Sequence, residues 1–323
     1  MRKWSLGLVG ILLVIGIVTF FVGQTDQITP KKVDMRSVKD GAGRMIEIPQ
    51  HPKRVVIIST SGLEMFIAAG GEEILAGYAE SSSTTKELLA RLSGVPSVGR
   101  SNTVSLEKII SLKPDLVIGS EAPFHEQLME PLKQARVPLL LLRSQRYQDN
   151  VEELQLFGEL TERTDLTEKM IEKMEGELKE ESERRDGRAA PKVLLIFGTS
   201  ESFLMVLPTS LAGDFLRLAG GKNVADEAAI QKIPGIKGTS FVPFSLEFAH
   251  QTDPDHVFFI IHGQKEKVEA HLQKALDNND AWLAIPAIRE GRFTVLPQPL
   301  FGINPGIRSP EAIKFIGQLL YPE

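Results

Sequence analysis

The chain has 323 residues, of which 42% are hydrophobic and 24% are charged, and its mean hydropathy is −0.05. This composition is that of an ordinary globular protein, and it excludes a disordered chain, a collagen-like repeat and a multispanning membrane protein. The formal net charge of −5 lacks the basic excess of nucleic-acid-binding proteins, so we expect no nucleic-acid partner. The chain contains no cysteine, which excludes disulfides, thiolate ligands, thiolate nucleophiles and a lipid-modified cysteine.

Residues 1–24 are predicted to be a membrane anchor or an export signal. Arg2 and Lys3 precede the uncharged, mostly apolar run 4–22. A helix over this run would be roughly 28 Å long, enough to cross the hydrocarbon core of a bilayer. Because no small-x-small cleavage pattern follows, we expect a retained anchor, with a cleaved signal peptide as the alternative. The positive flank predicts that the rest of the chain lies on the extracytoplasmic face of the membrane, or is secreted or periplasmic after cleavage.

Short apolar strands alternate with helical stretches from Arg54 onward, which is typical of a parallel sheet buried in an α/β fold. Before them, residues 25–53 are predicted to form a polar tether and a small hairpin over 33–48. In a first lobe over 54–148, we predict strands at 55–59, 74–78, 116–119 and 138–142, and helices at 63–69, 105–112 and 126–135.

A proline-free stretch rich in Glu and Lys, 149–186, predicts one long uninterrupted helix. The alternation of strands and helices then resumes in a second lobe over 187–323. There we predict strands at 192–197, 256–261 and 292–296, and helices at 210–219, 243–250, 265–276 and 309–320. The fold class predicted is therefore α/β, with two Rossmann-like lobes joined by one long rigid helix.

Ligands of open α/β sheets bind beyond the carboxyl ends of the strands, and this rule selects the candidate ligand-binding residues. His262 is the histidine that lies at such an edge, where it is either a ligand or a hydrogen-bonded structural residue. His256 lies about 20 Å away at the other end of the same strand, too far to share a metal ion with it. The small and polar residues selected with His262 are Ser59, Thr60, Ser61, Gly119, Ser120, Glu121, Arg143, Ser144, Gly198, Thr199, Ser200 and Gly263.

Enzyme motifs are largely missing from the sequence. It has no G-x-S-x-G elbow, H-E-x-x-H, P-loop or G-x-G-x-x-G after a strand. We therefore predict a binding protein without catalysis. The alternatives are an extracytoplasmic enzyme with Ser200 or Glu121 as its active group, and a structural or adhesive surface protein.

Several segments resemble the periplasmic-binding-protein family that serves iron-siderophore, haem and cobalamin ABC importers. In the first lobe they are RVVIIS at 54–59, LEMFIAAG at 63–70, VGR at 98–100 and SLEKIISLKPDLVI at 105–118. In the second lobe they are GDFLRLAGGKNV at 213–224, FSLE at 244–247 and DPD at 253–255. The resemblance covers nearly all of residues 33–323. It implies the class III fold of that family and a monomeric solute-binding protein that works with a permease dimer and a cytoplasmic ATPase. It also implies that Glu107 and Glu247 dock onto arginines of the permease.

The second lobe also resembles the haem receptors of the IsdE type. The similar segments are His262-Gly263, NNDAW at 278–282 and Phe301-Gly302. In those receptors a histidine at the position of His262 ligates the haem iron, so the resemblance implies haem as the transported ligand and His262 as its axial ligand.

The opposite axial ligand of those receptors is a methionine, whose place is taken here by Asn102. Met65, His125 and Tyr147 are the alternatives for a second iron ligand. Arg100, Arg143 and Arg146 are candidates to pair with haem propionates or with an anionic ferric siderophore. Because the expected methionine is missing, a ferric siderophore, or less favourably cobalamin, remains the alternative ligand.

Overall fold

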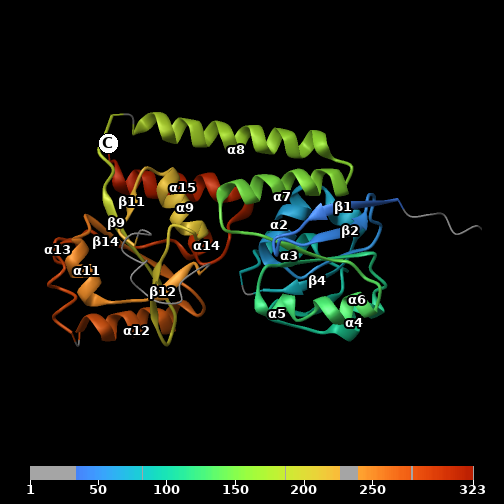
Figure 1. The fold of residues 1–323 in the computed structure, drawn as a ribbon, viewed down its shortest axis with the longest axis horizontal. Coiled ribbons are helices and arrows are strands. Elements are labelled where there is room, and N and C mark those ends of the chain that lie inside the picture. The colour runs from blue at the N-terminus through green and yellow to red at the C-terminus, as the bar shows by residue number, and fades with distance from the viewer. Residues whose placement is uncertain (1–33, 82, 186, 226–238, 278, 323) are drawn as a thin grey trace, which may run out of the picture. The chain divides into compact units, whose positions relative to one another are not determined.

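The computed structural model describes residues 34–81, 83–185, 187–225, 239–277 and 279–322 (Figure 1). The expected anchor over 1–24 and the polar tether lie outside the described residues. Within these described ranges, no helix is both long enough and apolar enough to span a bilayer. The chain from Met35 onward forms a compact unit of its own.

A small antiparallel hairpin precedes the first sheet, as predicted. Strand β1 (Met35–Lys39) pairs with β2 (Met45–Pro49) and places Val38 opposite Ile46. Its turn is closed by Asp40, which accepts hydrogen bonds from the backbone and the side chain of Arg44. The backbone N–H of Gly41 then donates to the carbonyl of Leu141 at 2.6 Å, which attaches the hairpin to the edge of the first sheet.

The first sheet has the strand order β6-β5-β4-β3-β7-β8, and all neighbouring pairs are parallel except β5 with β6. The predicted strands are confirmed. Strands β5 and β6 were not predicted, because β5 has one buried residue, Val98, and β6 has none. The strands are β3 (Val55–Ile57), β4 (Leu75–Glu80), β5 (Ser97–Arg100), β6 (Thr103–Val104), β7 (Leu116–Ser120) and β8 (Leu139–Leu142).

The helices of the first sheet are short, and we use "first lobe" for this sheet together with them. They are α2 (Thr60–Ala68), the 3-10 helix η1 (Gly71–Ile74), α3 (Lys86–Arg91), α4 (Leu106–Ser111), α5 (Pro123–Glu126) and α6 (Met129–Gln134). The helix predicted over 126–135 is thus two short helices. Gly70 follows α2 with φ +82°, a left-handed conformation that suits glycine and ends the helix.

The second sheet has the order β12-β10-β9-β13-β14, with β11 also paired to β9. Strands β9 (Lys192–Gly198), β11 (Lys222–Asn223), β13 (His256–Ile261) and β14 (Phe293–Val295) are parallel to one another. Strands β10 (Phe203–Val206) and β12 (Phe241–Pro243) were not predicted; β10 is antiparallel to both β9 and β12. A tight turn joins β9 to β10, and in it the hydroxyl of Thr199 accepts hydrogen bonds from the backbone of Glu201 and Ser202.

"Second lobe" denotes this second sheet with its helices. These are α9 (Leu211–Leu218), α11 (Leu246–Thr252), α12 (Lys265–Asp277), α13 (Pro286–Arg289), α14 (Gln298–Phe301), the 3-10 helix η2 (Gly306–Arg308) and α15 (Ser309–Leu320). The helices predicted over 210–219, 243–250, 265–276 and 309–320 are confirmed as α9, α11, α12 and α15 within a few residues at each end.

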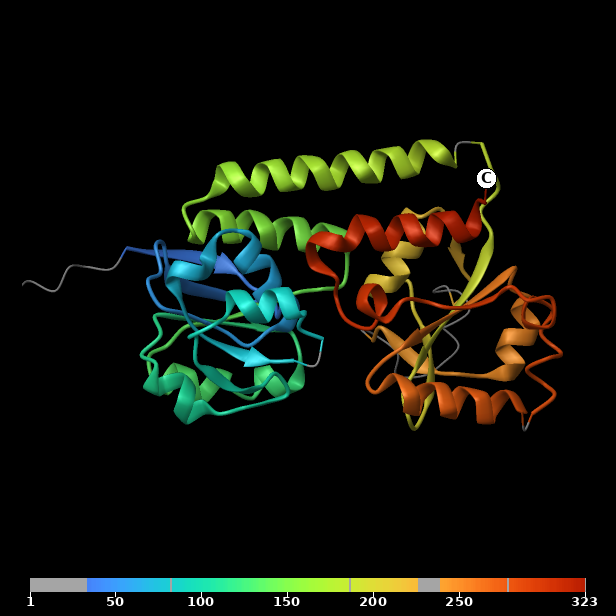
Figure 2. The same cartoon turned by 180° about the vertical axis from the view of Figure 1, so that it is seen from behind.

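The prediction of one uninterrupted helix over 149–186 is wrong. The segment forms two helices, α7 (Tyr147–Leu160) and α8 (Thr164–Arg184), and the chain reverses between them at Glu162, whose φ is +58°. No proline marks this break. It is stabilised by tertiary contacts, since the hydroxyl of Thr161 donates to the carbonyl of Ala69 on the first lobe at 2.8 Å. The connection between the lobes is therefore a helical hairpin of α7 and α8, and its longer helix, α8, packs on α7 and on α15 (Figures 1 and 2).

One apolar core runs through both lobes and the two connecting helices. Its buried side chains include Ile57 of the first sheet, Leu154 of α7, Ile171 of α8 and Phe258 of the second sheet. On the first lobe, Phe66 of α2 meets Phe157 of α7 edge to face at 5.4 Å between ring centroids. The helical hairpin thus belongs to the core and is not a detached linker.

We predict that Gly158→Ala destabilises the protein by about 1–3 kcal/mol, because an added Cβ on α7 would lie 2.1 Å from Oγ1 of Thr167 on α8. Gly176→Ala is the matched control on the exposed face of α8, where nothing lies within 4 Å of an added Cβ. That change should stabilise by up to about 1 kcal/mol through helix propensity. Urea denaturation measures both, and equal shifts for the two variants would contradict the close packing of α7 on α8.

Candidate functional site

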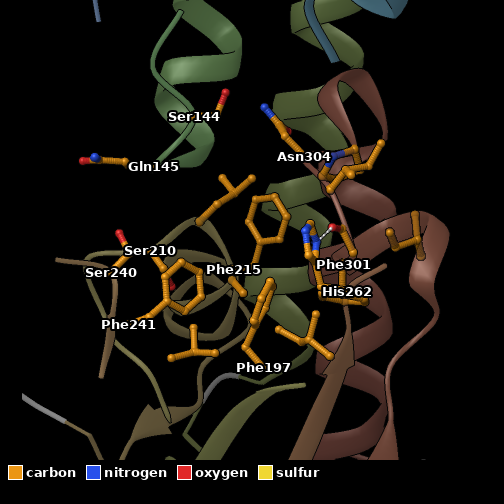
Figure 3. A pocket seen from close by; sticks show the side chains of 18 residues that line it. Ser144, Gln145, Phe197, Ser210, Phe215, Ser240, Phe241, His262, Phe301 and Asn304 are labelled. Atoms are coloured by element: carbon orange, nitrogen blue, oxygen red, sulfur yellow. Dashed lines mark hydrogen bonds between the residues drawn. The ribbon is translucent and has the colours of Figure 1, made fainter. Parts of the chain in front are cut away.

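A cavity of about 340 Å³ opens at the carboxyl ends of β9 and β13 (Figure 3). Its lining is predominantly aromatic and aliphatic, and the described residues that line it include no Asp, Glu, Lys or Arg. The lining residues are Ser144, Gln145, Phe197, Val206, Ser210, Leu211, Ala212, Phe215, Ser240, Phe241, Ile260, His262, Leu300, Phe301, Gly302, Ile303, Asn304 and Pro305. An uncharged cavity of this kind suits a ligand whose buried part is apolar.

The second lobe builds almost all of this cavity. Strands β9 and β13 contribute Phe197 and Ile260, and the unpredicted strands β10 and β12 contribute Val206 and Phe241. Among the described residues of the first lobe, only Ser144 and Gln145, in the segment that follows β8, line the cavity. The strand-end rule had selected Ser144.

The two ring nitrogens of His262, which lines the cavity, have different environments. Its Nδ1 lies 2.9 Å from the carbonyl oxygen of Gly302 (Figure 3). A carbonyl only accepts hydrogen bonds, so in the neutral imidazole Nδ1 carries the hydrogen and Nε2 carries the lone pair. The side chain is exposed, and no hydrogen bond to Nε2 occurs among the described residues. A histidine held by Nδ1 and open at Nε2 has the arrangement found in metal-ligating histidines.

Two phenylalanines extend the ring of His262 into an aromatic wall. The imidazole stacks on Phe197 with 4.9 Å between ring centroids and 30° between the planes. Phe197 in turn lies 4.8 Å from Phe241. Sequence reasoning missed both phenylalanines. Phe241 lies on an unpredicted strand, and Phe197 was read as an ordinary core residue of its strand. Such a wall suits contact with a planar apolar ligand.

Asn304 connects the cavity to the helical hairpin. Its side-chain amide donates to Oδ1 of Asn150 on α7 at 2.7 Å, and the amide of Asn150 donates to Oγ of Ser309 at 2.7 Å. Asn150 and Ser309 are buried, so this network satisfies polar groups that would otherwise cost stability. The sequence pattern contained no signal for this network.

Most of the first-lobe candidates do not line this cavity, and several of them make structural contacts. Ser59 is the N-cap of α2 and accepts from the N–H of Gly62, and Thr60 is the first residue of that helix. Arg143 donates to the carbonyl of Gly41 at 2.7 Å and lies 3.5 Å from Glu121. The polar atoms of Ser59 thus stabilise the start of α2, and those of Arg143 stabilise the position of the β1–β2 hairpin.

Some of the remaining candidates line the cavity and others do not. Arg100 ends β5 and Asn102 lies in the turn before β6; both side chains are exposed, and neither lines the cavity. Thr199 closes the turn between β9 and β10. Ser144, His262 and Phe301 are the candidates that the structure brings together, since all three line the cavity.

The three residues considered as a second iron ligand lie elsewhere. Met65 is 0% exposed in the apolar core. His125 is 0% exposed, and its Nδ1 accepts from the N–H of Ser120 while its Nε2 bonds to the carbonyl of Ser101. Tyr147 is 6% exposed and lines a separate cavity of about 540 Å³ formed with α8 and α9. None of the three therefore lines the cavity that contains His262.

Glu107 and Glu247 occupy equivalent positions on the two lobes. Each follows a Ser-Leu pair whose serine caps the helix: the hydroxyl of Ser105 accepts from the N–H of Lys108, and that of Ser245 accepts from the N–H of Phe248, each at 3.2 Å. Both glutamates lie in the first helical turn and are exposed. The same local sequence therefore presents one carboxylate on each lobe.

Three comparisons with known proteins agree with one another. Residues 55–300 match the family model described as periplasmic binding protein. The chain is 23% identical over 272 residues to a Bacillus subtilis protein named as an ABC transporter substrate-binding lipoprotein, YhfQ, covering 82% of each chain. It is 23% identical over 239 residues to the high-affinity heme uptake system protein IsdE of Staphylococcus aureus, covering 74% of this chain and 78% of that one. The crystal structure of S. aureus IsdE complexed with heme superposes with a TM-score of 0.71 and 21% identity, covering 83% of this chain and 98% of that one.

We predict that His125 makes the stability of the protein depend on pH. Burial lowers the pKa of its imidazole below the usual 6.5, so the unfolded chain takes up a proton more readily than the folded one. The stability contributed by neutral His125 is therefore present above pH 6.5 and is lost as the pH falls through that value. Urea denaturation between pH 7.5 and 5 should show that His125→Gln is less stable at pH 7.5 by about 1–3 kcal/mol but declines less steeply. Parallel curves for the two proteins would contradict this role.

Proposed function

This chain belongs to the periplasmic-binding-protein family, and from that membership we propose that the solute it captures for an ABC importer is haem. As a solute-binding protein of this family, the chain is not an enzyme. The observation that carries the proposal is His262, whose Nε2 lone pair lies open beside an apolar cavity while Nδ1–H is bound to Gly302. A neutral imidazole nitrogen is a standard axial ligand of haem iron.

The chemistry of the cavity wall supports haem over a ferric siderophore. Catecholate and many other siderophores form anionic iron complexes, which proteins bind with basic side chains. None of the described side chains that line this cavity is basic, whereas Phe197, Phe215 and Phe241 offer aromatic surface to a macrocycle. A ferric siderophore or cobalamin remains the alternative solute.

Haem also carries two propionates, which the cavity wall itself does not match. Arg143 and Arg146 flank Ser144 and Gln145, the first-lobe residues that line the cavity. Arg146 pairs with Asp149, and both arginine side chains are about half exposed. We therefore propose that the propionates extend beyond the apolar wall toward these arginines, which pair well with carboxylates.

The partners and the location follow from the proposed role. We propose that the protein works outside the cytoplasm as a monomer, with residues 1–24 as its membrane anchor or, alternatively, as a cleaved signal. The exposed carboxylates of Glu107 and Glu247 are the proposed contacts with the permease dimer, and their equivalent positions on the two lobes support this pairing.

We predict that ferric haem added to the purified full-length chain produces a shifted Soret band, and that His262→Ala weakens binding at least about 10-fold by removing the axial ligand. His256→Ala is the matched control at the opposite end of the same strand, and it should bind like the wild type. Absorbance titration measures all three proteins. The proposal fails if the wild type shows no Soret shift or if His262→Ala binds as tightly as the wild type. Saturable binding of a ferric hydroxamate or catecholate, followed by Trp fluorescence, would then support a siderophore.

We further predict that Glu107→Lys combined with Glu247→Lys abolishes haem uptake by cells while haem binding by the purified chain stays unchanged. The reversed charges would repel the arginines proposed on the permease. Glu87→Lys combined with Glu266→Lys is the matched control, since both residues are exposed in the first turn of other helices. Loss of haem binding, or equal loss of uptake in the control, would refute the docking role.

A further inference from the structure

Among the described residues that line the cavity, His262 is the one with a side chain that commonly ligates haem iron. We infer that His262 is the sole protein ligand of the bound iron, and that the sixth coordination position is a binding site for water or a small exogenous ligand such as imidazole, cyanide or azide. This inference rests on the proposed haem function and departs from the paired His and Met ligation that the resemblance implies.

The composition of the lining is the first observation. Apart from His262, its side chains are apolar or carry only hydroxyl and carboxamide groups. These neutral oxygen and nitrogen groups compete poorly for haem iron, and the described lining contains no Met, Tyr, Lys or second His.

Met65 is unavailable because of how it is packed. Its side chain is 0% exposed, and it belongs to the core cluster around Ile57 and Phe157. A Cβ added at Gly306 would lie 3.3 Å from its sulfur, so η2 also covers the thioether. Ligating iron would require extracting this side chain from the core, which costs several kcal/mol in comparable substitutions.

The two other candidate iron ligands, His125 and Tyr147, are unavailable for different reasons. Both ring nitrogens of His125 have partners within the first lobe, so neither has a free lone pair. Tyr147 lines a different cavity, and its pKa is raised to about 12 by burial and by the charges of Glu175 and Glu177. The raised pKa disfavours the phenolate, which is the form of tyrosine that ligates iron.

The arrangement has a functional consequence for delivery. With a single iron–protein bond, release of haem requires breaking only the bond between the iron and Nε2 of His262. The other interactions that retain haem are apolar contacts with residues such as Phe197 and Phe241. A small ligand that occupies the sixth position does not compete with His262. Such a ligand is therefore expected to bind the loaded protein without displacing haem.

The test uses the full-length chain loaded with ferric haem at neutral pH, examined by absorption and electron paramagnetic resonance. The expected result is a shifted Soret band with a high-spin spectrum, which added imidazole or cyanide converts to low spin in a saturable manner. A low-spin spectrum that forms without added ligand and does not change with imidazole would overturn the inference while leaving haem binding intact. Absence of any Soret shift would instead refute the proposed function and the inference together.

Variants identify the ligand independently. His262→Gly should lose haem binding at least about 10-fold and recover it when imidazole is added, because imidazole then occupies the vacated position. Met65→Leu and Tyr147→Phe conserve volume and should leave the high-spin spectrum of the loaded protein unchanged. A spectral change in either of these two variants, or undiminished binding by His262→Gly without imidazole, would show a second protein ligand and overturn the inference.

Discussion

The hydrogen bond from Nδ1–H of His262 to the carbonyl of Gly302 is the interaction on which the proposed site depends. It selects one tautomer of the imidazole, orients the ring and leaves the Nε2 lone pair free. The acceptor lies beside α14, 40 residues further along the chain, so the bond exists only because β13 and α14 pack together. The site is therefore a consequence of the completed second lobe and not of any local motif.

The second lobe also supplies the apolar wall beside His262. Two antiparallel strands, β10 and β12, convert an otherwise parallel sheet into a mixed one and place Val206 and Phe241 in the same cavity lining as His262 and Phe301. The helical hairpin of α7 and α8 contributes stability through the common core and reaches the cavity through the pair Asn150 and Asn304. Binding chemistry thus resides mainly in one lobe, while the connecting helices hold that lobe to the other.

The sequence predicted the fold class well because apolar strands and capped helices carry local signals. Such local signals include the alternation of apolar strands and helices from Val55 to Leu142 and the left-handed glycine that ends α2. The break at Glu162 was not predictable, since it depends on contacts of Thr161 with the first lobe. At the site, the strand-end rule found His262 and Ser144. That Met65 and His125 lie outside the cavity lining was not predictable, because a sequence does not show which face of a helix or loop turns into the core.

The central claim is that Nε2 of His262 binds haem iron, and resonance Raman spectroscopy of the reduced, haem-loaded protein tests it most directly. We predict an iron–histidine stretching band in the wild type that shifts when the protein is labelled with ¹⁵N-histidine and that is absent from His262→Ala. A loaded wild-type protein without this band, or a His262→Ala variant that retains it, would contradict the account.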